Sequence, residues 1–413
     1  MRLLIATKYR NLVGGVERYL QILIPGLVNR GHQIGLLYET PFEETGERID
    51  PPGVALETWC WSRGSREETL AAVAQWGPEM VYSQGLEDGA LEGALLDAHP
   101  VALYAHNYYG TCISGRKCHS FPAVRPCGRR FGAACLVLYY PRRCGGLNPS
   151  TMWRMYGRES QINSRLRRYT KLLVASTHMA REYHNHGVRP DQIDVVPLPA
   201  ADDTPDGAPT ARTPRGRILF IGRLTDIKGT GNLVHAVAAA NGQVGPLTLT
   251  IAGDGPELEA VQALARALGV SMRCTGWIGG AEKAELLRET DLLVVPSLWP
   301  EPFGMVGVEA GSQGVPAAGY AVGGIPDWLI PGVTGELASG DPPTSDGLAQ
   351  AIVRALTDPV HYGRLCQGAW EMSRKFTLDG HLARLEPILA GRANDVHPNE
   401  VHTEAISDSC PRI

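Results

Sequence analysis

The stretch PSLWPEPFGMVGVEAGSQGVP, residues 296–316, decides the fold class. It follows the apolar run LLVV at 292–295, which is typical of a strand buried on both faces of a parallel sheet. Pro300 and Pro302 then stiffen a turn, because residues before proline avoid helical geometry. Gly304 opens a segment that has the pattern of a helix. A buried strand, a tight turn and a helix in this order indicate an α/β domain.

The same alternation of short apolar runs with helix-like segments extends across the chain. Segments with helical spacing of apolar residues, such as 16–28 and 258–268, lie between some of the runs. This alternation predicts an α/β fold with parallel, doubly wound sheets covered by helices on both faces. The expected strands are residues 3–7, 33–39, 80–83, 101–105, 171–176 and 193–198 in a first unit, and 217–224, 247–252, 272–277 and 292–297 in a second.

The two units are separated by PAADDTPDGAPTARTP at 199–214, which is rich in Pro, Asp, Thr and Ala and lacks periodicity. Such a composition predicts a linker. We therefore expect an N-terminal domain at 1–198 and a C-terminal domain at 215–376, with a ligand cleft at the carboxyl ends of their strands. A helix near 378–390 is expected to pack back on the first domain. The polar segment 392–413 has no pattern and is expected to be a disordered tail.

Composition agrees with a globular protein, since 44% of the 413 residues are hydrophobic and 20% are charged. No apolar run approaches the roughly 20 residues that span a bilayer. The N-terminal MRLLIATKYR has no small-residue cleavage site and fits a first strand better than a signal peptide. We expect a cytoplasmic enzyme.

The charge distribution is uneven although the net charge is only −4. Between Arg116 and Lys171 there are eleven Arg and two Lys against a single acid, Glu159. A density of like charge of this kind favours contact with something anionic, either a phosphate-bearing acceptor or the inner face of a membrane. The alternative is a solvated face balanced by acids elsewhere. No RNA-binding or helix-turn-helix pattern accompanies the charge, so nucleic acid is not an expected partner.

Two glutamates flank the helix start that follows the opening stretch. Glu301 lies in the turn and Glu309 lies one helix-length further on. The helix N-terminus between them offers free N–H groups and a partial positive charge, which suit a diphosphate. Glu301 can accept hydrogen bonds from sugar hydroxyls, and Glu309 from a ribose diol. The alternative is a capped helix with two solvated acids.

A second element, GRLTDIKG at 222–229, follows the strand that ends in FIG. Its glycines allow close backbone approach to a ligand, and Arg223 and Lys228 suit an anionic leaving group. A basic loop at a helix start is the alternative. The sequence GDGPE at 253–257 also turns from strand to helix, and it is equally compatible with an ordinary Asp-Gly turn.

A third element, GGVERY at 14–19, follows the first strand and opens a helix. Gly14 and Gly15 can bring backbone N–H groups against the same diphosphate from the opposite domain. The element is not a G-x-G-x-x-G fingerprint, which disfavours a nicotinamide-dependent oxidoreductase. His106 closes the strand VALYAH, where it has either a structural or a functional role.

Taken in this order, the Gly-Gly pair, G-R-L-x3-K-G and E-P-F-G-x4-E resemble the retaining GT-B glycosyltransferases, specifically glycosyltransferase family four, also called group 1. The resemblance covers residues 1 to about 391 and is most specific in the second domain. It implies two Rossmann-like domains and transfer of a hexosyl group, with retention, from a nucleotide-diphosphate sugar. We expect a UDP-sugar as donor, and a polysaccharide, lipid-linked or small-molecule acceptor.

The resemblance also assigns site residues. Glu301 contacts the donor sugar, His106 lies by its C6 hydroxyl, and Glu309 binds the nucleotide ribose. These roles make a catalytic set of His106, Arg223, Lys228 and Glu301. The expected donor-binding set is Gly14, Gly15, Arg223, Lys228, Trp277, Ile278, Glu301, Phe303, Gly304, Met305 and Glu309. No cofactor is expected for catalysis, because the cations and the helix dipole offset the charge of the leaving group.

The departure from the family pattern is a cysteine-rich insertion at 112–144. It holds Cys112, Cys118, Cys127, Cys135 and Cys144, with His119 beside the second. Clustered cysteines in a reducing compartment favour a structural zinc or an iron–sulfur cluster. The spacing matches no standard signature, so disulfides and free thiols remain alternatives.

For the whole chain, the rival functions are a nucleotide-sugar epimerase on the same scaffold and a catalytically silent carbohydrate-binding protein.

Overall fold

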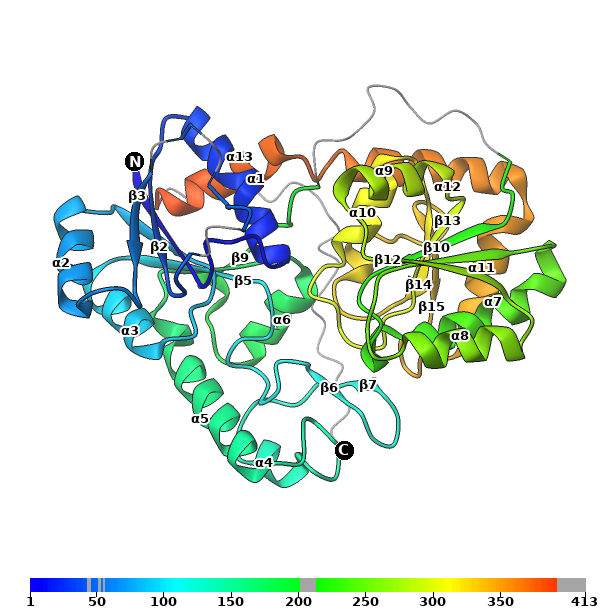
Figure 1. Ribbon diagram of the computed structural model, residues 1–413, viewed down its shortest axis with the longest axis horizontal. Helices are drawn as coiled ribbons and strands as arrows, with labels where there is room; N and C mark the ends of the chain where they lie inside the picture. Colours follow the sequence, from blue (N-terminus) through cyan, green and yellow to red (C-terminus); the bar gives the residue numbers. More distant parts are fainter. Residues whose placement is uncertain (43–45, 51–52, 55, 201–212, 392–413) are drawn as a thin grey trace.

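A computed structural model describes residues 1–42, 46–50, 53–54, 56–200 and 213–391. The expected linker at 199–214 falls largely outside these residues, and the expected tail at 392–413 falls entirely outside them. Two α/β units lie side by side, the first in blue to green and the second in green to orange (Figure 1). No helix within the described residues is long and apolar enough to cross a bilayer.

The first unit is built on a seven-stranded sheet in the order β3-β2-β1-β4-β5-β8-β9, and every pair is parallel. Alternate residues of the central strand enter opposite cores, since Leu3 and Ile5 belong to one hydrophobic cluster and Leu4 and Ala6 to another. Both faces of the sheet are therefore buried. The strands are β1 (Arg2–Thr7), β2 (Gln33–Tyr38), β3 (Glu57–Cys60), β4 (Met80–Ser83), β5 (Val101–Ala105), β8 (Lys171–Val174) and β9 (Ile193–Val195). The helices between them are α1 (Gly15–Asn29), α2 (Arg66–Trp76), α3 (Gly89–Ala98) and α6 (Thr177–Asn185).

The second unit is built on a six-stranded parallel sheet in the order β12-β11-β10-β13-β14-β15. The strand order reverses between β10 and β13, so the loops that follow these two strands face each other at the carboxyl edge. They are the loops that contain GRLTDIKG and PEPFG. The strands are β10 (Arg217–Ile221), β11 (Thr248–Ala252), β12 (Ser271–Gly276), β13 (Leu292–Val295), β14 (Ala317–Tyr320) and β15 (Gly335–Ala338). The helices are α7 (Thr230–Val244), α8 (Leu258–Ala267), α9 (Gly280–Glu289), α10 (Met305–Ser312), α11 (Ser345–Thr357) and α12 (Pro359–Ser373).

The last described helix, α13 (Leu378–Leu389), returns to the first unit and packs against α1 (Figure 1). Gly26 of α1 leaves the space that Leu378 and Leu382 fill, because a Cβ there would lie 2.8 Å from Leu382. His381 bonds through Nε2 to the Tyr19 hydroxyl at 2.8 Å. The helix thus ties the chain after the second unit to the first.

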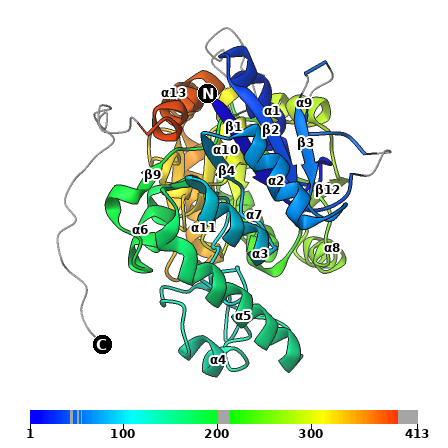
Figure 2. The same cartoon turned by 90° about the vertical axis from the view of Figure 1, so that its left-hand side faces the viewer.

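The segment between β5 and β8 adds an insertion that does not join either main sheet. It contains the small hairpin β6 (Cys118–His119) and β7 (Arg125–Pro126), α4 (Ala134–Leu138) and α5 (Pro149–Arg165). Both views show α4 and most of α5 at one extremity of the molecule, beyond the two sheets (Figures 1 and 2). Buried Lys117 fixes the insertion to α6 through an ion pair with Glu182 and a 2.6 Å bond to the Arg129 carbonyl.

Candidate active site

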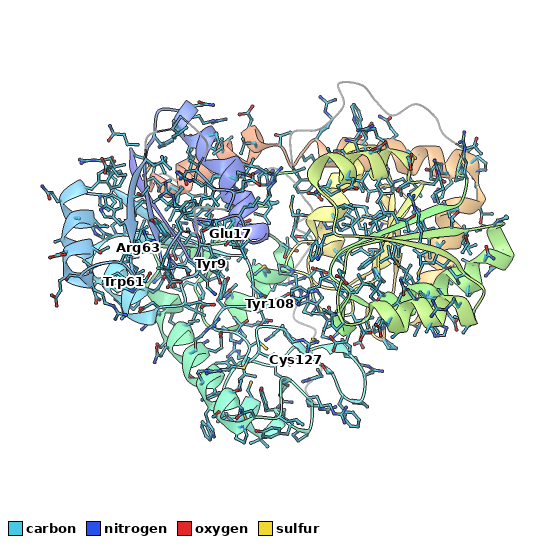
Figure 3. All side chains as sticks on the ribbon, in the orientation of Figure 1. Tyr9, Glu17, Trp61, Arg63, Tyr108 and Cys127 are labelled. Carbon is cyan, nitrogen blue, oxygen red and sulfur yellow. The ribbon has the colours of Figure 1, made fainter. Side chains whose placement is uncertain are left out.

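A cavity of about 270 Å³ lies between the two units. The first unit contributes His106 at the end of β5, and the second contributes Lys228, Ser297 and Glu301 from the loops after β10 and β13. The two units also touch beside it, since the Tyr108 hydroxyl donates a 2.6 Å bond to the Pro300 carbonyl. Tyr108 lies between the two bodies of the molecule (Figure 3).

Glu301 is the buried acid of this cavity. Its Oε1 accepts hydrogen bonds from Lys228 Nζ at 2.6 Å and from Ser297 Oγ at 2.5 Å. Its backbone is clamped as well, because the N–H of Gly324 donates to its carbonyl at 2.7 Å. A side chain at Gly323 would collide with the Glu301 backbone, which explains the glycine there. The carboxylate and the ammonium are therefore presented together to whatever enters the cavity.

His106 is held as a neutral imidazole. Its Nε2 lies 2.8 Å from Gln84 Oε1, and the Gln84 amide nitrogen donates to the Tyr82 carbonyl, so Nε2 carries the proton. Burial, with a smaller contribution from His381, lowers the pKa of His106 to about 3. Its ring packs against Tyr104, with centroids 4.6 Å apart. His106 can therefore exchange hydrogen bonds with a ligand at neutral pH without carrying charge.

A second cavity, of about 180 Å³, adjoins the first. Leu198 and Met305 line both, so the two cavities are neighbours, and together they are called the cleft. Gly15 and Arg18 of α1 line one side, and Glu309 of α10 lines the other.

Glu309 has a partner that the sequence did not reveal. Its Oε1 accepts a 2.7 Å bond from Lys283 Nζ, and each side chain remains partly exposed. Lys283 is an ordinary helix lysine by sequence, and only the packing of α9 against α10 shows its role. Arg18 was missed for the same reason. The second cavity thus ends in a lysine–glutamate pair, as the first does.

Helix α10 begins between the two pairs. Gly304 caps it with a left-handed φ of +87°, which an L side chain rarely adopts. Gly304, Met305 and Phe303 all line the first cavity. The Phe303 ring packs against Phe376, and its carbonyl accepts a 2.7 Å bond from Trp328. The helix N-terminus, with its free N–H groups, therefore opens on the cleft.

The glycines at the start of α1 occupy the opposite wall. The N–H of Gly14 donates to Glu17 Oε2 at 2.9 Å, which uses that amide within the helix cap. A Cβ at Gly15 would meet nothing within 4 Å, and Gly15 lines the second cavity. Gly15, and not Gly14, is therefore free to approach a ligand.

Four expected donor-site residues do not line either cavity, namely Gly14, Arg223, Trp277 and Ile278. Arg223 is exposed and has no side-chain partner within the part of the chain that the structure describes. Trp277 is 72% exposed, and Ile278 packs against the core.

The five cysteines of the insertion are free thiols. Burial raises the pKa of Cys118 to about 12 and that of Cys144 to about 11. Across the described residues, no group of three or more His, Cys, Asp or Glu side chains is arranged to hold a metal ion. The five thiols are nevertheless close enough to influence one another, since Cys112, Cys127 and Cys135 each contribute to the raised pKa of Cys144. The hypothesis of a zinc or iron–sulfur site stays a prediction, which elemental analysis tests.

Two parallel-sheet units with a cleft at their carboxyl edges define the GT-B class of fold. The sucrose-phosphate synthase of Thermosynechococcus elongatus shares it, with a TM-score of 0.69 at 19% identity over 95% of this chain and 99% of that one. HepE of Anabaena, solved with UDP and glucose, has a TM-score of 0.67 at 18% identity over 95% of this chain and 100% of that one. At these identities the likeness shows the fold alone.

The family follows from sequence. Residues 13–201 match Glycosyltransferase Family 4, and residues 207–372 match Glycosyl transferases group 1. Both models describe glycosyltransferases, and together they cover most of both units. It is 34% identical to the glycogen synthase of Mycobacterium tuberculosis over 168 residues, 40% of each chain. It is 31% identical to the D-inositol 3-phosphate glycosyltransferase of Actinosynnema mirum over 278 residues, 62% of this chain and 64% of that one. The matched regions thus span 40% and 64% of these two relatives.

Proposed function

We propose that the protein transfers a sugar from a UDP-sugar to an acceptor hydroxyl with retention of anomeric configuration. The observation that carries the proposal is the arrangement of the cleft. Two lysine–glutamate pairs, Lys228–Glu301 and Lys283–Glu309, line its two neighbouring cavities, and the N-terminus of α10 opens beside Lys228. Such a site can accommodate the ribose, the diphosphate and the sugar of a nucleotide sugar side by side.

In this arrangement Glu309 accepts hydrogen bonds from the ribose hydroxyls, with Gly15 and Arg18 across the cavity. Lys228 and the N–H groups at Gly304 bind the diphosphate, since a helix N-terminus favours an anion. Glu301 accepts from the donor sugar, and neutral His106 hydrogen-bonds one of its hydroxyls. The UDP in the structurally similar HepE complex supports the choice of nucleotide.

The reaction depends more on stabilising the leaving group than on removing a proton with a strong base. The bond from the anomeric carbon to the diphosphate oxygen breaks, and negative charge grows on the diphosphate. Lys228 and the α10 N-terminus stabilise that charge, which is the largest single contribution in many enzymes. The acceptor oxygen bonds to the same face of the anomeric carbon, and its proton passes to the departing diphosphate. No further cofactor enters this proposal.

For the acceptor we propose a phosphate-bearing or lipid-linked molecule. The arginine-rich insertion follows His106 in the chain, and its Arg116 pairs with Asp226 in the loop that also carries Lys228. One relative is named for a phosphorylated substrate, D-inositol 3-phosphate, which is compatible with this class. A nucleotide-sugar epimerase or a silent carbohydrate-binding protein would not need an acceptor at all.

The test is a thermal-shift panel of nucleotide sugars followed by turnover with the donor that binds. Binding to the folded state raises the midpoint, by RT ln(1 + [L]/Kd) in free energy. We expect one donor to stabilise the protein, with Glu309→Ala abolishing the shift and Glu285→Ala, an exposed change on α9, retaining it. Stabilisation without acceptor-dependent release of the nucleotide would favour the epimerase or the silent binder.

A further inference from the structure

The insertion exposes large apolar side chains to an unusual extent. Five of the eleven large hydrophobic residues exposed in the described chain fall within residues 121–153, and their exposed fractions run from 37% to 83%. They are Phe121, Val137, Tyr140, Leu147 and Trp153. Scattered single residues of this kind are normal on a protein surface, but a local concentration marks an interaction site.

The same segment carries cations that lack acidic partners. Within the described residues, no carboxylate lies in ion-pairing distance of six exposed arginines: Arg125, Arg129, Arg130, Arg142, Arg143 and Arg154. Some neighbouring arginines do have acidic partners, since Arg116 pairs with Asp226 and Arg168 with Asp97. Arg143 stacks on the exposed Phe121 ring, 5.0 Å from its centroid. Cationic and apolar groups therefore intermingle on one segment.

The surface does not result from a failure to fold. The insertion has a small core of its own, in which Ile113, Tyr139 and Met152 are buried while neighbouring Tyr140 and Trp153 are not. A buried network also anchors it to α6, where the Phe131 N–H donates to His186 Nε2 at 2.9 Å. Helix α4, which carries Val137, and most of α5, which carries Trp153, lie at one extremity of the molecule (Figures 1 and 2).

We propose that residues 121–154, here called the basic apolar surface, dock on an anionic lipid bilayer. Arginines bind lipid phosphates, and aromatic and aliphatic side chains enter the headgroup boundary. A soluble polyanion would satisfy the arginines, but it would offer nothing to Val137, Leu147 or Trp153. The combination of both kinds of side chain favours a bilayer over a polysaccharide or a nucleic acid.

The position of the surface relates docking to the cleft. The insertion starts after His106, and Arg116 makes a bidentate bond to Asp226, at 2.7 and 2.8 Å, in the loop that also carries Lys228. Docking would therefore hold the mouth of the cleft near the bilayer, where a lipid-linked acceptor lies. This last step rests on the proposed function, whereas docking itself does not.

The test is co-sedimentation with phosphatidylcholine vesicles that contain or lack phosphatidylglycerol. The double variants Arg142→Glu/Arg143→Glu and Leu147→Ser/Trp153→Ser remove one kind of interaction each. Matched controls on the second unit are Arg266→Glu on α8 and Val360→Ser on α12, whose 71% exposure resembles the 74% of Val137. Thermal unfolding and nucleotide binding check that every variant is folded. A protein that docks on vesicles but does not bind the donor would count against the proposed function alone.

We expect the protein to sediment with the anionic vesicles only and to dissociate as salt is raised. Each double variant should weaken vesicle binding by at least about 10-fold, and the controls should bind like the wild type. For the arginine variant, the reason is that one cation near such a surface contributes roughly 5-fold to the affinity. A second measurement uses a variant that keeps an aromatic ring at position 153. Brominated lipid should quench the tryptophan fluorescence of the wild type more than that of Trp153→Phe. Failure to sediment would overturn the proposal. So would full binding by the Leu147/Trp153 variant, which would indicate a site for a soluble polyanion.

Discussion

Replacing Glu309 by Ala should weaken binding of UDP by about 10- to 150-fold. A hydrogen bond to a charged group contributes roughly 1.5–3 kcal/mol, and each 1.4 kcal/mol is tenfold in affinity. The carboxylate can accept hydrogen bonds from both ribose hydroxyls, but its side chain stays 21% exposed. The total loss of binding free energy therefore stays within the range for one hydrogen bond that is shielded from water. Lys283 loses its partner in this variant, but at 30% side-chain exposure it is readily rehydrated.

Titration calorimetry with UDP measures this change directly. Glu309→Gln should lie between the wild type and Glu309→Ala, because it keeps an acceptor oxygen and loses the charge. Lys283→Ala, which leaves Glu309 in place, should change affinity less than Glu309→Ala does. Glu285→Ala is the control on the same helix as Lys283. Equal losses in Glu301→Ala and Glu309→Ala would refute the division of the cleft into a ribose end and a sugar end.

The other predictions concern catalysis, metal and pH. Lys228→Ala should lower kcat by at least about 100-fold in steady-state assays, because it removes a preorganised charge facing the diphosphate; full activity would place the diphosphate elsewhere. Glu301→Gln should lower kcat while UDP affinity by calorimetry stays within about threefold, since neutral Gln lacks only the charge offered to the sugar. Activity should survive dialysis against EDTA, and a loss that Mg²⁺ restores would contradict the proposed leaving-group stabilisation. Burial lowers the pKa of His381 to about 4, below its unfolded value of ~6.5, so unfolding takes up a proton and stability falls as pH falls from about 6.5 to 4. His381→Gln should flatten the urea-derived stability profile by about 1.2 kcal/mol per pH unit near pH 5, and an unchanged slope would contradict the buried neutral imidazole.

Most of the fold could be predicted from the sequence, because most of its buried strands consist of β-branched and aliphatic residues. Three strands of the two main sheets were missed, namely β3, β14 and β15, and the last two lack this signature. Ala317–Tyr320 reads AAGY and Gly335–Ala338 reads GELA, so small residues fill them. Gly335 has to be small because a Cβ there would collide with the Ala317 carbonyl. Close packing, which no local pattern records, determines those strands.

The site was predictable where chemistry and turn geometry coincide. The turn prolines and Gly304 located Glu301, and the helix after them located Glu309. Lys283 was not predictable, since its partner comes from another helix and its own sequence context is ordinary. The roles expected of Arg223 and Trp277 stay predictions, because both side chains are exposed and line neither cavity.

The insertion shows the same limit. Its arginine content predicted an anionic partner, but the exposure of Val137 beside buried Tyr139 could be known only from the packing of α4.

The central claim is that the cleft between the two units transfers a sugar from a nucleotide-diphosphate donor. The most direct measurement is release of the nucleoside diphosphate from each of a panel of nucleotide sugars, with and without a lipid-linked or phosphorylated acceptor. We expect acceptor-dependent release of UDP, at least about 100-fold slower in Lys228→Ala, with NMR of the product showing the donor's anomeric configuration. Absence of release from every donor that binds, or release that is indifferent to Lys228, would contradict it.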